Sequence, residues 1–120
     1  MFIYKTEIQE HQVRHEQAIE IAEIFRLLGD PTRLRIVVCC LDRAQSVAAI
    51  AATVGASPSL VSHHLRLLRA GRLVRAERRG RQVFYAAADA HVRSIVNDMI
   101  EHAAEADGLA HHPFGKDKVA

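Results

Sequence analysis

Apolar residues recur at helical spacing in two adjacent segments of the first third of the chain. Between about His15 and Leu28 an apolar side chain returns every third or fourth position, and Gly29 ends the pattern. Asp30 then precedes Pro31, the combination of a capping carboxylate and a first-turn proline that begins a helix. We predict two helices, with apolar stripes formed by Ile19, Ala22, Phe25 and Leu28 and by Leu34, Val37, Val38 and Leu41.

Two shorter helices are predicted next, separated by a glycine. Ser46 is a suitable cap for a helix that continues to Val54, and Gly55 supplies the turn after it. A serine-proline pair repeats the capped start for a helix over residues 58–70. Two helices joined by so short a turn predict a helix-turn-helix, whose second helix enters the major groove of DNA.

The hydrophobic period changes from helical to alternating beyond Gly71. Residues 73–78 and 81–85 predict two short strands, and the Arg79-Gly80 step between them predicts the turn of a β-hairpin. Such a hairpin forms a wing beside the helix-turn-helix. The expected fold is therefore mainly α with a two-stranded β wing, a winged helix-turn-helix.

A last helix is predicted after the hairpin. Asp89 is positioned to cap it, and its apolar stripe continues to about Ala106, where an Asp-Gly pair ends the pattern. The remaining residues are too poor in apolar side chains for a core element, so we expect a domain over 1–106 and a tail over 107–120. The stripe of this helix consists of Val92, Ile95, Val96, Met99 and Ile100.

Composition and charge narrow the class of protein. A chain of 120 residues forms one small domain that buries only about two thirds of its unfolded surface, so a partner subunit would add stability. We expect a cytoplasmic protein with no membrane partner, because the chain lacks a signal-peptide pattern and a run of about 18 apolar residues. The net charge is only +2, but seven arginines and one acid, Glu77, occur from Arg66 to Arg81.

That basic segment has the composition of a surface that binds duplex DNA. Hydroxyl groups reach phosphates or base edges, arginine binds guanine through two hydrogen bonds, and wing arginines displace counterions from phosphates. The alternative, a solvated basic face without a partner, ignores that the arginines share a segment with a capped helix-turn-helix. We expect DNA contacts from Ser57, Ser59, Ser62, His63 and Arg66 of the helix and from Arg75, Arg78, Arg79 and Arg81 of the wing, with His64 partly buried.

Two histidines and two carboxylates of the last helix have the spacing of a metal site shared by two chains. His91 and His102 share a helix face but stand about 16 Å apart along its axis, so one chain cannot bring both to one ion. Two antiparallel copies would pair Asp89 and His91 of one chain with His102 and Glu105 of the other. This closed set of four ligands suits Zn²⁺, with cobalt as a common substitute. The alternative is a helix cap and three surface residues that coincide.

The stretches LLGDPTRLRIV and SPSLVSHHLRLLRAGRLVRAERRGRQVFY together resemble the ArsR/SmtB family of metal-responsive winged-helix repressors, over about residues 25–105. The resemblance implies a homodimer in which the first and last helices pack across a twofold axis. It also implies that each subunit reads half of a palindromic operator and that a metal effector lowers DNA affinity. The last-helix site of the zinc-sensing members matches Asp89, His91, His102 and Glu105.

The resemblance assigns further roles. In zinc-sensing relatives the histidine that matches His102 donates its outer ring N–H to a backbone carbonyl just after the recognition helix, which here belongs to Arg72. Nickel- and cobalt-sensing relatives add histidines from the tail, so His111 and His112 are either additional ligands for Ni²⁺ or Co²⁺ or incidental residues. His11 and His15 have helical spacing too, but two ligands rarely make a selective site, and we expect surface residues.

The cysteines are adjacent, and the family comparison argues against a thiolate metal site. Members that sense arsenic, cadmium or lead place cysteines on the third helix, where this chain has none. We expect Cys39 and Cys40 to pack in or near the core. Some members use a second-helix cysteine for redox or persulfide sensing. The alternative function is therefore a winged-helix repressor without a metal response, including a thiol sensor that uses Cys39 or Cys40. No activated nucleophile is evident, and we do not expect an enzyme.

Overall fold

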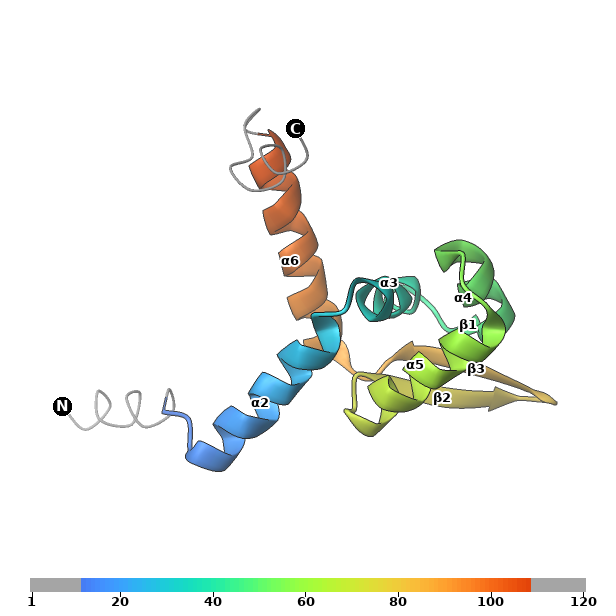
Figure 1. Cartoon of the computed structure of the whole chain (residues 1–120), viewed down its shortest axis with the longest axis horizontal. Coiled ribbons are helices and arrows are strands. Elements are labelled where there is room, and N and C mark those ends of the chain that lie inside the picture. Colours follow the sequence, from blue (N-terminus) through green and yellow to red (C-terminus); the bar gives the residue numbers. More distant parts are fainter. Residues whose placement is uncertain (1–11, 109–120) are drawn as a thin grey trace.

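A computed structural model describes residues 12–108, and it contains helices packed around a small sheet (Figure 1). His11 and the tail histidines His111 and His112, named above, are outside the described residues. The helices and strands follow one another as α2 (His15–Leu28), α3 (Pro31–Cys39), β1 (Gln45–Ser46), α4 (Val47–Val54), α5 (Pro58–Ala70), β2 (Val74–Arg79), β3 (Gln82–Ala87) and α6 (Ala90–Gly108).

Side-chain caps begin four of the helices where the sequence predicts them. Each capping oxygen accepts a hydrogen bond from the backbone N–H three residues further on, which satisfies one of the N–H groups that a helix start leaves without a partner. These caps confirm the predicted helix starts. The pairs are Asp30 with Arg33, Ser46 with Ala49, Ser57 with Leu60 and Asp89 with Val92, at 2.9–3.1 Å.

Two predicted helix ends are wrong by a few residues. Helix α3 stops at Cys39, and Cys40 is its C-cap, so Leu41 lies beyond the helix although it is buried. Helix α6 continues through the Asp-Gly pair to Gly108, beyond the predicted end near Ala106. Tertiary burial fixes Leu41 in place without helical geometry, and the Asp-Gly pair is accommodated in the last turn of α6.

The wing differs from its predicted turn. Arg79 pairs with Gln82, so the two-residue loop is Gly80-Arg81 and not Arg79-Gly80. Gly80 has φ 63°, a left-handed conformation that suits glycine at a tight hairpin turn. Arg81 therefore lies in the turn at the tip of the wing, while Arg79 belongs to strand β2.

A third strand, not predicted from the sequence, joins the wing to the helix-turn-helix. The antiparallel sheet has the order β1-β3-β2, with Gln45 opposite Tyr85 and Ser46 opposite Phe84. Ser46 has extended backbone angles, φ −78° and ψ 161°, which serve both a strand and a helix N-cap. Two residues are too few to show an alternating pattern, so this strand could not be predicted from the hydrophobic period.

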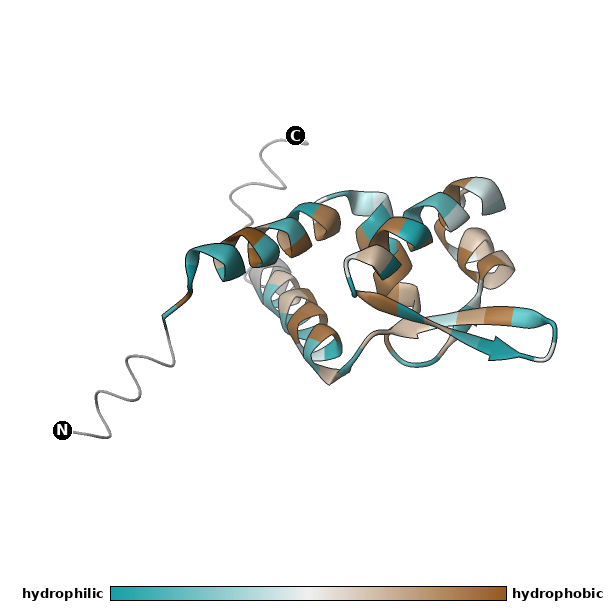
Figure 2. Cartoon of the chain, turned by 90° about the horizontal axis from the view of Figure 1, so that it is seen from below, coloured by the Kyte–Doolittle hydropathy of each residue, from teal (hydrophilic) through white to brown (hydrophobic). Residues whose placement is uncertain are grey.

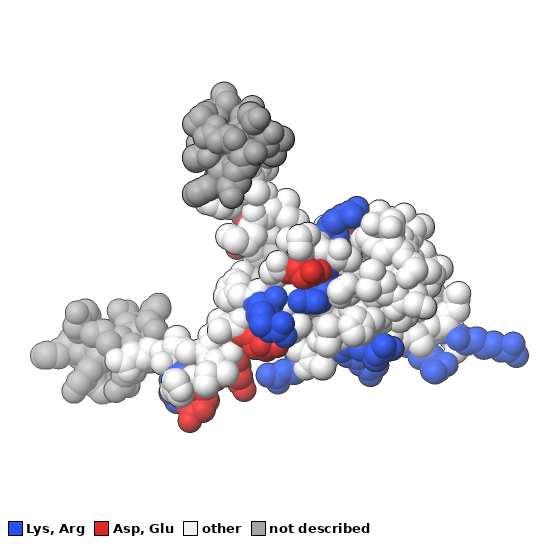
Figure 3. Space-filling model, in the orientation of Figure 1, with Lys and Arg blue, Asp and Glu red and all other residues white. Residues whose placement is uncertain are grey.

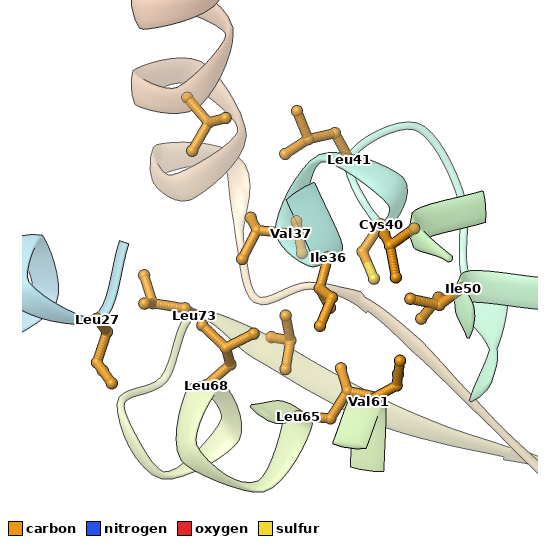
Figure 4. Close-up of a cluster of buried hydrophobic side chains, with 14 of the residues drawn as sticks. Leu27, Ile36, Val37, Cys40, Leu41, Ile50, Val61, Leu65, Leu68 and Leu73 are labelled. Atoms are coloured by element: carbon orange, nitrogen blue, oxygen red, sulfur yellow. The ribbon is translucent and has the colours of Figure 1, made fainter. Parts of the chain in front are cut away.

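The hydrophobic core is enclosed by α3, α4, α5 and the base of the sheet (Figure 4). Ile36 of α3, Ile50 of α4 and Leu65 of α5 point toward one another and are each at most 1% exposed. Each such side chain contributes about 1.5–3 kcal/mol through the apolar surface that it removes from water. This core fixes the position of α5 relative to α4 and the wing.

Helices α2 and α6 extend away from this core, and their apolar stripes are largely uncovered (Figures 1 and 2). Leu27 is the buried residue of α2, and Val96 is the buried residue of the part of α6 whose side chains are described. The stripes have the predicted helical period, and many of their members stay exposed in the single chain. The exposed members on α2 and α6 include Ile19, Phe25, Ile95, Met99 and Ile100, and Leu34 and Val38 of α3 are exposed at the hollow between these helices.

Candidate DNA-reading surface and metal-ligand positions

The outward face of α5 carries the residues predicted to read DNA. Val61, Leu65 and Leu68 are buried at i, i+4 and i+7, so the opposite side of the helix faces solvent. Ser59, His63 and Arg66 are exposed there, and Ser62 is half-buried at its border. Ser57 is exposed at the helix start, where its hydroxyl oxygen is occupied as the N-cap acceptor. The core packing of α5 therefore presents one polar stripe outward.

His64 faces the protein and not the DNA-reading stripe. Its ring is half-buried, its Nδ1 is buried and finds no hydrogen-bond partner among the described residues, and its centroid is 5.7 Å from that of His63. Burial lowers the pKa of His64, although the carboxylate of Asp30 acts in the opposite direction. The predicted partial burial of His64 is confirmed.

Basic side chains of the described residues collect on the lower edge of the molecule and at the wing tip, whereas acidic ones collect over α2 (Figure 3). In the wing, Arg75 and Arg79 both form ion pairs with Glu77, and the Arg79 guanidinium lies 4.9 Å from the centroid of the Phe84 ring. Hydrogen bonds from Arg79 and Arg75 lower the pKa of the Glu77 carboxyl. Arg78 and Arg81 are exposed, and neither forms an ion pair with another described residue.

The predicted metal ligands occupy the two ends of α6. Asp89 uses Oδ1 to accept the Val92 N–H, at 2.9 Å, which leaves its second carboxylate oxygen available. His91 is exposed in the first turn, and His102 and Glu105 are exposed near the other end of the helix. Over residues 12–108 the structure brings no three potential ligand side chains together in one chain. This agrees with the argument from helix length that one chain cannot complete the set.

Asp89 and His91 line a hollow of about 480 Å³ between α2, the start of α6 and the turn that follows α5. Arg72 lines the same hollow, so the predicted relay residue is beside one end of the ligand set. Arg72 has φ 61°, an unusual value for a residue with a side chain. Its N–H donates to the Arg69 carbonyl, and the next N–H, of Leu73, donates to the Leu68 carbonyl, which together end α5.

Gly71 marks a close approach of α2 to the end of α5. A Cβ at Gly71 would be 2.4 Å from Cδ1 of Leu27, so any larger residue would require the Leu27 side chain to shift. Gly71 has an ordinary φ of −82°, and the left-handed conformation is that of Arg72. The turn after α5 is thus tied to α2 on one side and to the first turn of α6 on the other.

A comparison with known proteins settles the family. The chain is 39% identical over 101 residues to the transcriptional repressor SmtB homolog of Synechocystis, across 84% of this chain and 76% of that protein. This chain belongs to the arsR family of bacterial regulatory proteins. Residues 30–76, from the cap of α3 into the wing, match the family description "Bacterial regulatory protein, arsR family". The family consists of transcriptional regulators, so this ArsR-family protein is not an enzyme.

Other relatives of this ArsR-family chain are regulators too. The HTH-type transcriptional regulator KmtR of Mycobacterium tuberculosis is 39% identical over 98 residues, across 81% of this chain and 75% of its own length. The homodimeric winged helix-turn-helix domain Mb0332 of Mycobacterium bovis has a TM-score of 0.69 at 26% identity, covering 85% of this chain and 95% of that one. The cadmium metal-sensor CmtR of Mycobacterium tuberculosis has a TM-score of 0.59 at 43% identity, covering 66% and 82%. The predicted winged helix-turn-helix fold is confirmed.

One contact of this ArsR-family structure was missed by the sequence analysis. Arg93, in the first turns of α6, donates from Nε to the carbonyl oxygen of Leu41, at 3.0 Å. It is the one side-chain hydrogen bond that joins α6 to another element within the described residues. The two residues are 52 positions apart, and neither carries a local signal of the pairing. Arg93 therefore attaches α6 to the segment that leads into the helix-turn-helix.

The thiols have the environment of core residues. Cys40 is 1% exposed, and burial raises its pKa to about 12. Cys39 is half-buried, and burial raises its pKa as well, against a smaller effect of Arg35 in the other direction. The predicted packing of both residues in or beside the core is confirmed. Thiolates are the reactive form of cysteine, so these environments disfavour thiol sensing.

None of the described helices has the length and apolar character needed to cross a membrane.

Proposed function

We propose that this chain is a homodimeric transcriptional repressor of the cytoplasm that binds a palindromic operator and is released from it when Zn²⁺ binds between its two copies of α6. One observation carries the proposal. The ligand pairs Asp89 with His91 and His102 with Glu105 lie exposed at opposite ends of one helix, and the apolar stripe between them is uncovered. A helix with two half-sites and an open apolar face suits pairing with an antiparallel copy of itself.

The uncovered surface supports the dimer. Phe25 of α2 lines the hollow beside His91 and also a second hollow of about 380 Å³ between α2, α3 and α6. Ile95 lines both as well, and Met99 is 55% exposed. Large apolar side chains grouped in this way mark an interaction surface. A second copy would cover them, and the related Mb0332 domain is described as homodimeric.

The donor set supports a zinc-type ligand. Two imidazoles and two carboxylates form a closed tetrahedral set, and a bound ion supplies a positive charge that four side chains from two chains share. The second oxygen of Asp89 and the exposed rings of His91 and His102 have no competing hydrogen bonds among the described residues. Related regulators include one named as a cadmium metal-sensor, so a metal effector fits the family, whereas the choice of zinc rests on these nitrogen and oxygen ligands.

The residues of this chain also suggest how the reading helix is affected. Holding Asp89 and His91 against the other copy's His102 and Glu105 fixes the first turn of α6, beside Arg72 at the end of α5. We propose that the Arg72 carbonyl accepts a hydrogen bond from the ring of the other copy's His102. This bond orients that ring and biases the position of α5. The coupling between metal and operator is expected to be about 1–3 kcal/mol and reciprocal, so the operator should weaken zinc binding equally.

Zinc titration of the purified dimer tests the proposal. Operator affinity is measured on a palindromic duplex selected from a random pool, and calorimetry counts the bound ions. We expect two Zn²⁺ per dimer and lower operator affinity with zinc, both lost in His102→Ala and Glu105→Gln. Glu101→Gln is the matched control, because Glu101 is an exposed carboxylate on the same helix outside the set. A normal zinc response in His102→Ala would exclude this site.

The DNA-reading surface is tested on the apo protein. Arg66→Ala combined with Arg79→Ala should weaken operator binding, because phosphate and base contacts provide both affinity and register. Binding should also weaken as salt increases. Operator affinity that is unchanged by the two substitutions, or insensitive to ionic strength, would contradict the assignment of α5 and the wing.

Truncation after Gly108 distinguishes zinc from nickel or cobalt. The helix ligands close a tetrahedron without help, whereas octahedral Ni²⁺ or Co²⁺ requires further ligands, for which His111 and His112 are candidates. We expect the truncated protein to keep its zinc response and a tetrahedral cobalt spectrum. A six-coordinate cobalt spectrum in the full chain that changes on truncation would favour nickel or cobalt as the effector.

A further inference from the structure

The wing contains an acidic residue at the centre of its basic surface. Strand alternation places Arg75, Glu77 and Arg79 on one face of β2. The two oxygens of Glu77 are divided between the arginines: Oε2 accepts from Nη1 of Arg75, and Oε1 accepts from Nη2 of Arg79 at 2.8 Å. The Glu77 side chain is 24% exposed, whereas those of Arg75 and Arg79 are 53% and 56% exposed. Both guanidinium groups are therefore held at an anion that the protein itself supplies.

Arg79 is restrained from a second direction. Phe84 is directly opposite Glu77 in the register of β2 and β3, and the Arg79 guanidinium lies over its ring. A cation over an aromatic face adds about 0.5–1 kcal/mol at exposed sites. Arg78 and Arg81 have no ion pair with any residue that the structure describes. The wing thus has two restrained arginines and two that are free to follow a phosphate backbone.

We propose that Glu77 is a specificity-determining residue of the wing, which occupies Arg75 and Arg79 and so lowers affinity for arbitrary duplex DNA more than affinity for the operator. The inference rests on the DNA-binding part of the proposed function and not on its metal response. Binding to arbitrary DNA depends almost entirely on phosphate neutralisation, so occupying two of four wing arginines with a carboxylate weakens it directly. In the operator complex the base contacts of α5 fix the position of the wing on the duplex. Arg75 and Arg79, already held in place by Glu77, then face specific phosphates.

Glu77→Gln tests this inference, because glutamine keeps the shape of the side chain and removes its charge. Affinities for the operator and for an unrelated duplex of equal length are measured over a range of salt concentrations. We expect affinity for unrelated DNA to rise about threefold to tenfold, and the slope of log affinity against log salt to steepen by about 0.9 for each arginine released. Operator affinity should change less, so the ratio of the two affinities falls.

Glu23→Gln is the matched control. It removes the same charge and also breaks an arginine ion pair, with Arg26, but on α2, away from the wing. A second comparison separates release of the two arginines from the loss of one negative charge. In a protein that carries Arg75→Ala and Arg79→Ala, adding Glu77→Gln should no longer raise the affinity for unrelated DNA. The inference is wrong if the affinity ratio is unchanged by Glu77→Gln, or if the gain persists without the two arginines. Failure of the wild-type protein to bind any operator would instead reject the proposed function.

Discussion

Two regions of the molecule bury their apolar side chains to different extents: α3 with the helix-turn-helix and its wing, and the helices α2 and α6. The first region encloses its own core, in which Ile36, Ile50 and Leu65 are almost fully buried. The second region has the same helical periodicity, yet Phe25 and Met99 remain more than half exposed. Amphipathic patterning therefore specifies a helix face without specifying what covers it. A regulator with this division has a rigid reading unit attached to helices whose packing a partner completes.

Removing one core side chain should separate the two regions most clearly. Leu65→Ala should lower the free energy of unfolding by about 2–5 kcal/mol, because a cavity remains where α5 packs on α3 and α4. Met99→Ala removes a side chain that is 55% exposed in the single chain and should affect stability only where dimers form. Urea denaturation at several protein concentrations measures both. Equal losses at every concentration would show that α6 belongs to the same core.

A charge on the open surface should break the second region and spare the first. Phe25→Asp should convert the dimer to a monomer, because Phe25 lines both apolar hollows and would place a carboxylate between two copies. Circular dichroism should remain that of a folded helical protein, while sedimentation reports the monomer. Val13→Asp is the control, since Val13 is 55% exposed and lines neither hollow. A monomer produced by both variants would point to general charge repulsion.

The contact between the two regions should contribute a smaller amount. Arg93→Met removes the hydrogen bond to the Leu41 carbonyl and should cost about 1 kcal/mol, because charged hydrogen bonds are strong but this one is only partly buried. Hydrogen exchange should accelerate in the first turns of α6 and not in α5. Arg43→Met is the control, because Arg43 is an exposed arginine two residues after Leu41, and its replacement should leave hydrogen exchange unchanged. Faster exchange throughout α5 would mean that the regions unfold together.

Substitution of Asp89, the cap of α6, should have the smallest effect on stability. It also separates the capping role of Asp89 from its proposed role as a metal ligand. Asp89→Ala should cost about 1 kcal/mol through loss of the bond to the Val92 N–H. Asp89→Ser should retain most of that stability, because serine caps as well, yet it should lose zinc affinity if the carboxylate is a ligand. Thermal denaturation and zinc calorimetry of the two variants provide the comparison. Full zinc affinity in Asp89→Ser would remove Asp89 from the proposed set.

Local chemistry accounts for what the sequence could predict. Caps, a first-turn proline and helical periodicity act over three or four residues, and the helix starts after Asp30, Ser46, Ser57 and Asp89 were all predicted from them. The outward stripe of α5 followed from the same periodicity, because the buried residues define the opposite side. The fold class and the outward face of α5 could therefore be predicted from a single sequence, whereas the DNA contacts of that face stay a prediction.

Pairings between distant segments were not within reach. Strand β1 exists only because Gln45 and Ser46 pair with the middle of β3, and the side chain of Arg93 donates to the Leu41 carbonyl across 52 positions. The contact of the Arg79 guanidinium with the Phe84 ring also depends on the register of β2 and β3, which a count of charges does not reveal. The apolar stripes of α2 and α6 have the predicted period, but the period alone does not state whether the surface that covers a stripe comes from the same chain.

The double role of Ser46 has a mechanical consequence. One residue both pairs with Phe84 of the wing and caps α4, so the hairpin is attached to the first helix of the helix-turn-helix partway along β3 and not only through the turn after α5. Because it is attached at two points, the wing cannot reorient independently of the helix-turn-helix. When the wing and α5 both contact DNA, little orientational freedom of one relative to the other is lost, which lowers the entropic cost of binding.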